Sequence, residues 1–142
     1  MPAFADVYAL APDRSASLIR RFLDQFAPLR EETAEGYEMP RFAESPDRLF
    51  GRAEELVDHL AAHPSEPYSV YWRNLGGGPP FVMAFFTTDG AVILGLSCVE
   101  HESAEWLSRL RVFAGPGPHC TLFEQAPPDS AAEFRLLAEA AA

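Results

Sequence analysis

Two cysteines and two histidines in the second half of the chain have side chains that could bind a metal ion. Cys98 and His101 have the Cys-x-x-His spacing of zinc ligands. His119 and Cys120 are adjacent, and neighbouring residues of a strand point to opposite faces, so this pair could ligate together only from a loop. A buried cysteine with surface histidines explains the four residues equally well. We therefore predict no metal site and no cofactor.

A second pair of histidines has helical spacing. His59 and His63 are four residues apart, a geometry in which two side chains can hold one zinc ion. The glutamate of a zinc protease is missing between them. Both lie near the predicted C-terminus of a helix, where imidazole interacts favourably with exposed carbonyl groups. We therefore predict that they cap this helix.

The patterns of covalent catalysis are missing. The chain has no Gly-x-Ser-x-Gly motif, and the glycines at 76–78 lack the Lys-Ser/Thr of a phosphate-binding loop. Burial in an apolar strand would make the Cys98 thiol inert. All 11 basic residues are arginine, which excludes Schiff-base chemistry on a lysine. The sequence therefore predicts no catalytic residues and favours a non-enzymatic protein.

Negative charge is concentrated in one quarter of the chain. Residues 31–66 contain ten acidic residues and three arginines, which gives −7 of the total net charge of −10. Acidity argues against a nucleic-acid partner, because binding to a phosphate backbone requires a basic surface. Such a field would attract a basic protein, although it would also serve simply to keep a small protein soluble.

An aromatic segment follows this acidic region. Residues 67–73 have the composition of a strand, whose alternating side chains face the core or point outward. Exposed tyrosine and tryptophan are typical of binding hot spots, although a strand can also bury all of them. Combining charge and aromatic character, we predict a partner-binding surface made of Glu31, Glu32, Glu35, Tyr37, Glu38, Glu54, Glu55, Asp58, Tyr71 and Arg73.

The elements that must position these residues indicate a single α+β domain over residues 1–142, with a short antiparallel sheet and about four helices. The predicted order is β-α-(β)-α-β-β-β-α-β-α, in which the bracketed element is a short edge strand near residues 37–42. The other predicted strands are 4–10, 67–73, 81–88, 91–98 and 119–124. The predicted helices begin at a cap at Asp13 or Ser15, span 52–62 and 104–113 (capped by Ser103), and start again at Asp129 with a Ser130–Glu133 capping box.

The pair Asp89-Gly90 predicts the turn of a central hairpin over residues 81–98. A two-residue loop would place Phe86 opposite Ile93 and Phe85 opposite Leu94. One face would then carry Phe81, Met83, Phe85, Val92, Leu94, Leu96 and Cys98, and the other Val82, Ala84, Phe86, Ile93, Gly95 and Ser97. Both faces are largely apolar, so we expect these strands to be central.

Three segments, at 53–60, 66–72 and 82–96, together resemble the layout of small bacterial immunity proteins, which are encoded beside secreted toxins. The resemblance is one of element pattern across residues 53–100 and carries over no individual residues. It implies a small, acidic, cytoplasmic protein that binds and blocks a toxin without a cofactor.

Our leading hypothesis is therefore an acidic inhibitor that masks a basic, toxin-like protein, located in the cytoplasm and not in a membrane. The alternative is a small-molecule-binding domain or enzyme with a pocket near Tyr71, Arg73, His101 and His119. A third hypothesis is a homodimer that covers the hairpin face at 82–86 and 93–97 with its own copy.

Overall fold

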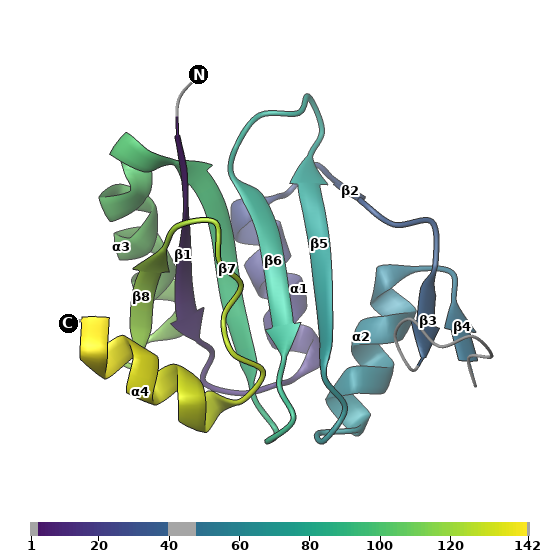
Figure 1. The fold of residues 1–142 in the computed structure, drawn as a ribbon. Helices are drawn as coiled ribbons and strands as arrows, with labels where there is room; N and C mark the ends of the chain where they lie inside the picture. Colours follow the sequence, from purple (N-terminus) through teal and green to yellow (C-terminus); the bar gives the residue numbers. More distant parts are fainter. Residues whose placement is uncertain (1–2, 40–47, 142) are drawn as a thin grey trace.

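The computed structural model describes residues 3–39 and 48–141, which form an α+β fold (Figure 1). Its strands are β1 (Phe4–Leu10), β2 (Arg30–Glu32), β3 (Tyr37–Met39), β4 (Arg48–Phe50), β5 (Tyr68–Asn74), β6 (Phe81–Phe86), β7 (Val92–Val99) and β8 (His119–Leu122). Its helices are α1 (Ala16–Phe26), α2 (Ala53–Ala62), α3 (Ser103–Ala114) and α4 (Ala131–Ala141), and a 3-10 turn, η1 (Glu100–Glu102), precedes α3. Among the helices of the described residues, none has the length and hydropathy needed to traverse a bilayer.

Six strands form one antiparallel sheet in the order β2-β5-β6-β7-β1-β8. The predicted central hairpin is confirmed, since β6 and β7 occupy the middle of the sheet. The predicted edge strand is only partly right. The edge strand of the main sheet is β2, whereas β3 pairs with β4 in a separate two-stranded sheet, and residues 40–42 of the prediction lie outside the described residues.

The predicted register of the central hairpin is wrong by one residue. Phe85 pairs with Ile93, and Thr87 N–H donates to the Ala91 carbonyl oxygen at 3.0 Å, so the loop has three residues. Gly90 supplies the positive φ of 86° that such a loop requires. Because side chains alternate, the shift moves three β7 residues to the face that carries Phe81, Met83 and Phe85. These residues are Ile93, Gly95 and Ser97.

Asp89 explains why the longer loop is stable. Its carboxylate accepts hydrogen bonds from the Ala131 N–H at 2.8 Å and the Ala132 N–H at 3.2 Å. These N–H groups belong to the first turn of α4, where no intrahelical acceptor exists. The hairpin loop therefore holds the beginning of the last helix.

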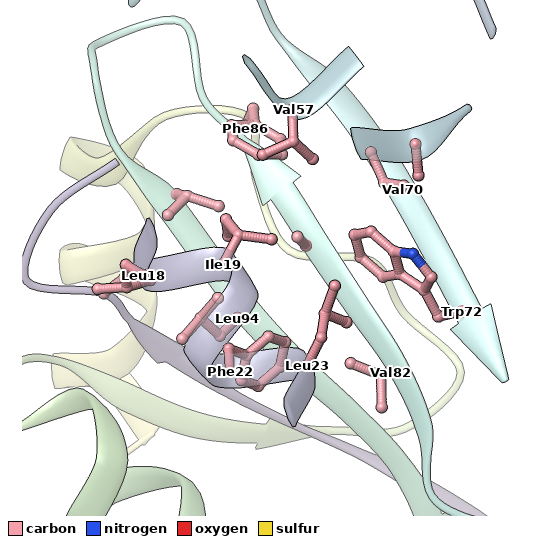
Figure 2. Packing of buried hydrophobic residues seen from close by; sticks show 14 of the residues in the cluster. Leu18, Ile19, Phe22, Leu23, Val57, Val70, Trp72, Val82, Phe86 and Leu94 are labelled. Atoms are coloured by element: carbon pink, nitrogen blue, oxygen red, sulfur yellow. The ribbon is translucent and has the colours of Figure 1, made fainter. Parts of the chain in front are cut away.

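Helices cover both faces of the sheet. On one face, α1, α2 and α3 pack on the larger apolar cluster, in which side chains of α1 and α2 meet those of the central strands (Figure 2). The labelled members are Leu18, Ile19, Phe22, Leu23, Val57, Val70, Trp72, Val82, Phe86 and Leu94. On the other face, α4 lies over β1 and β8, and none of the described helices covers β5 (Figure 1). Helix α4 thus covers part of the face that the homodimer hypothesis assigns to a second copy.

Two of the three predicted serine caps are confirmed, and the third is not. Ser15 caps α1 as predicted, since its Oγ accepts the Leu18 N–H at 3.1 Å. Ser130 Oγ likewise accepts the Glu133 N–H at 3.1 Å. Ser103, however, is the first residue of α3 rather than its cap, because η1 runs directly into the helix.

Arg14, which the sequence does not single out, joins three parts of the fold. It is 7% exposed, and its guanidinium carbon lies 5.1 Å from the ring centroid of Phe86. It donates hydrogen bonds to the carbonyl oxygens of Leu60 (3.0 Å), His63 (3.1 Å), Glu66 (2.7 Å), Thr87 (2.7 Å) and Ala91 (3.0 Å). The start of α1 is thereby bound to the end of α2 and to the hairpin.

Candidate functional site

The predicted partner-binding residues gather at one end of the molecule, around β2, α2, β3 and the edge of β5, at the right of Figure 1. We call this region, residues 30–39 and 53–62 with Tyr71 and Arg73, the acidic edge. Two hollows open on it, and each is built by different elements.

The larger hollow is a groove of about 600 Å³ between α1, α2 and β2. Its floor is apolar and includes Ile19, Leu23, Val57 and Trp72. Its rim carries charges of both signs, namely Arg20, Asp24, Arg30, Glu31, Glu32, Arg52, Glu54 and Asp58. The groove therefore offers apolar contact area surrounded by polar groups, which is the usual arrangement of a protein-binding surface.

Several rim carboxylates pair with the protein's own arginines. Glu31 Oε1 lies 2.6 Å from Arg73 Nε, and Glu54 Oε1 lies 3.7 Å from Arg20 Nη2. All four side chains are about half exposed, and such surface pairs contribute on the order of 0–1 kcal/mol. These pairs reduce the net charge of the rim without fixing the structure strongly.

Glu32 and Tyr37 have structural roles instead of the surface role predicted for them. The Glu32 carboxylate accepts hydrogen bonds from the Tyr37 hydroxyl at 3.0 Å and from the Ala53 N–H at 2.7 Å. It therefore caps α2, for which Arg52 provides no side-chain cap. Burial, together with the bond to Glu32, raises the pKa of Tyr37, whose ring is only 4% exposed. Tyr37 is therefore buried and Glu32 is half-buried, and both side chains bond within the protein.

Four predicted acids remain exposed and form no ion pair with any residue that the structure describes. Glu35 precedes β3 and Glu38 lies within it, whereas Glu55 and Asp58 lie on the outer side of α2. The charge of these carboxylates is consequently directed to solvent. We call them the unpaired acids.

The smaller hollow, of about 330 Å³, lies where β5 extends beyond the end of β2. We call it the tyrosine hollow and define it by Thr33, Tyr37, Glu38, Tyr68, Ser69 and Tyr71. The Tyr37 and Tyr68 rings meet at 6.3 Å and are buried, whereas Tyr71 is 37% exposed. The outward orientation of Tyr71 and Arg73 on β5, opposite to buried Trp72, agrees with the predicted alternation.

The residues of the alternative enzyme hypothesis do not come together. Tyr71 and Arg73 lie on β5 and His119 lies on β8, with β6, β7 and β1 between them. His101 is exposed in η1. His119 instead lines a separate hollow of about 550 Å³ beside β8 and α4. The fold therefore does not bring these four residues together in one pocket.

The two cysteines cannot share a ligand with each other. The alternation of β7 places Cys98 on the face covered by α1 and α3, whereas Cys120 belongs to the cluster beneath α4. Burial raises the pKa of Cys98 to about 11 and also raises the pKa of Cys120, so both thiols stay protonated near neutral pH. Among the described residues, no group of three or more His, Cys, Asp or Glu side chains is arranged to hold a metal ion.

His59 and His63 interact with the protein at the end of α2. Their rings stack at 4.0 Å, and His63 Nδ1 lies 2.7 Å from the His59 carbonyl oxygen. Since a carbonyl can only accept, this nitrogen is the donor. The contact agrees with the predicted capping for His63. The ring of His59 instead meets a side chain, since its Nε2 lies 2.8 Å from Glu66 Oε2.

The acidic edge thus contains carboxylates, tyrosines and apolar area. These groups suit noncovalent recognition, because they combine apolar contact area with a polar and charged rim. Comparison of the chain with protein-family models, with curated proteins and with solved structures gives no match.

Proposed function

We propose that this chain is a non-enzymatic binding protein that masks a basic surface of another protein, as immunity proteins mask a toxin. The proposal is supported chiefly by one observation. Of the four unpaired acids, Asp58 stands on the rim of a groove whose floor is apolar and includes Trp72, and Glu38 lines the tyrosine hollow. Glu35 and Glu55 are exposed on the segments that carry these two acids, the approach to β3 and helix α2. The groove supplies contact area, and the carboxylates supply a negative field.

The two parts would contribute differently to binding. Exposed carboxylates each add little affinity, but together with the net charge of −10 they raise the rate of encounter with a basic protein. Affinity would come from desolvating the apolar floor and the exposed ring of Tyr71. An inhibitor that must capture a toxin quickly needs both properties.

The experiment compares three tagged forms of the full chain by affinity capture from the source organism. The edge variant neutralises the unpaired acids as E35Q/E38Q/E55Q/D58N. The matched control, E100Q/E124Q/E133Q/E139Q, changes the net charge by the same amount using exposed acids elsewhere. The captured protein is then purified with each form, and its toxicity in cells is measured with and without this chain.

We expect the wild type and the control to retain one basic partner in a stoichiometric complex, and the edge variant to lose at least about tenfold in affinity at low salt. The partner alone should arrest growth, and co-expression of this chain should restore it. If no protein is retained by the wild type beyond what the edge variant retains, the proposal is wrong.

A further inference from the structure

We propose that the tyrosine hollow binds the guanidinium group of an arginine side chain that the partner presents. This inference rests on the proposed function, because it names the chemistry of one contact at the same edge. Three observations support it: unpaired backbone groups, an exposed aromatic ring and the sign of the local charge.

The first observation concerns the backbone of β5 in the hollow. Strand β2 ends at Glu32, and the last contact between the two strands runs from the Thr33 N–H to the Tyr71 carbonyl at 3.4 Å. Since hydrogen-bonding direction alternates along an antiparallel strand, the N–H and C=O groups of Ser69 point to the same side as those of Tyr71. No hydrogen bond joins them to residues 3–39 or 48–141. Within these described ranges, the Ser69 carbonyl is thus an acceptor without a donor.

The second observation is the ring of Tyr71. It meets Phe85 at 5.8 Å with an interplanar angle of 89°, which fixes its orientation while leaving it 37% exposed. The chain already places arginines against aromatic rings elsewhere, for example Arg109 over Trp106 at 4.7 Å. Within the described residues, no arginine lies over Tyr71. Its ring is therefore available for a cation from outside.

The third observation is the charge of the lining. The described residues of the tyrosine hollow include the Glu38 carboxylate and no basic side chain. The neighbouring groove differs, because Arg20, Arg30 and Arg52 stand on its rim beside the acids. A cation is therefore favoured more in the hollow than in the groove.

Arginine fits this set of groups better than lysine. Its planar guanidinium can stack on Tyr71 while its N–H groups point at the Glu38 carboxylate and the Ser69 carbonyl. An ammonium group is a compact charge without a face to stack, so it can satisfy the acceptors but gains less from the ring.

The test uses NMR titration of the ¹⁵N-labelled full chain with acetyl-Gly-Arg-Gly-amide. The matched probe, acetyl-Gly-citrulline-Gly-amide, has nearly the same shape without the charge, and acetyl-Gly-Lys-Gly-amide tests the choice of cation. We expect saturable shifts of the Glu38, Ser69 and Tyr71 amides with the arginine peptide, at a Kd on the order of millimolar. The citrulline peptide should cause no saturable shift, and the lysine peptide should bind more weakly.

Variants assign the contacts. Tyr71→Ala should weaken binding about fivefold, whereas Tyr71→Phe, which keeps the ring face, should stay within about twofold of the wild type. Glu38→Gln should weaken binding about twofold and reduce its salt dependence. Glu139→Gln, which removes an exposed acid of α4 outside the acidic edge, is the control and should change nothing.

The inference is overturned if the arginine peptide gives no saturable shift, if citrulline or lysine binds as well, or if Tyr71→Ala binds normally. These results differ from a failure of the proposed function. A partner captured equally well by wild type and Tyr71→Ala would remove only the hollow from the interface. If the hollow bound arginine but the chain captured no protein, the cation site would stand and the proposed inhibitor function would be wrong.

Discussion

The hairpin end of the sheet and the acidic edge both rely on charged side chains, but these side chains bond to different groups. At the hairpin end, Arg14 and Asp89 bind backbone carbonyl and N–H groups of the hairpin, α2 and α4. At the acidic edge, Glu31 and Glu54 pair with arginines at the surface. A charge that bonds backbone groups connects elements, whether it is buried like Arg14 or exposed like Asp89, whereas an exposed ion pair mainly shapes the field seen by a partner.

Glu32 shows that the surroundings of a charged side chain, rather than its position in the sequence, decide whether it bonds the backbone or forms a surface pair. It lies next to Glu31 on β2, yet its carboxylate binds the Ala53 N–H and the Tyr37 hydroxyl. Of these two adjacent glutamates, Glu32 therefore stabilises the fold and Glu31 belongs to the surface. The comparison can be tested by removing one charge of each kind and measuring the free energy of unfolding.

The largest effect is expected for Arg14→Ala. Five buried or half-buried carbonyl groups lose their donor, and the free energy of unfolding should fall by about 3 kcal/mol or more. Arg14→Lys should recover only part of this, because an ammonium cannot reach five acceptors spread over two segments, residues 60–66 and 87–91. Urea unfolding measures both. A loss below about 1 kcal/mol for Arg14→Ala would mean that the backbone there is held without it.

Glu32→Ala should come second, with a loss of about 1–2 kcal/mol, because the first turn of α2 loses its acceptor. Glu35→Ala is the matched control. Its carboxylate has no partner among the described residues, so its removal should change stability by less than about 0.5 kcal/mol. Equal losses for the two variants would contradict the structural role of Glu32.

Asp89→Asn should cost about 0.5–1 kcal/mol at pH 7, since the carboxylate caps α4. Desolvation alone would raise the pKa of Asp89, but hydrogen bonds from Ala131, Thr87 and Ala132 hold it below its ordinary value of 3.8. The unfolded chain then binds the proton more readily than the folded one. The wild-type advantage is therefore complete above pH 3.8 and disappears as pH falls through the lower native pKa. Unfolding measured across this range should show the two proteins converging, and a constant difference would refute the assignment.

The smallest effect is expected for Glu31→Gln. The Glu31 and Arg73 side chains are 45% and 48% exposed, so breaking their pair should change stability by about 0.5 kcal/mol at most. A loss above about 1 kcal/mol would show that this part of the acidic edge is structural after all.

Much of the fold follows from local pattern. Strand β1 was predicted with its observed bounds, and the stripe of α1 from Leu18 to Phe26 is buried as its spacing indicates. The hairpin register could not be predicted in the same way. Asp-Gly suits loops of two or three residues, and the bond that accompanies the longer loop comes from α4, 42 residues further along the chain.

The sequence predicts where the candidate site lies and which residue types it contains, but not the role of each residue. The charge of residues 31–66 marks the acidic edge in the sequence. Glu32 accepts its helix-capping bond from Ala53, 21 residues away, and the Tyr37 ring packs against Tyr68 on β5, so no local pattern indicates either contact. Arg14 was missed for the same reason, because its acceptors lie 46–77 residues later.

The place of β1 between β7 and β8 affects how the chain can fold during synthesis. Strand β1 is synthesised well before its two neighbours, which are made only at residues 92–99 and 119–122. Until then its backbone groups have no partner in the sheet, and contacts of such high sequence separation are slow to form. A nascent chain that stops before residue 92 should remain open on this side and exposed to proteases. The protein should acquire protection late and in one step.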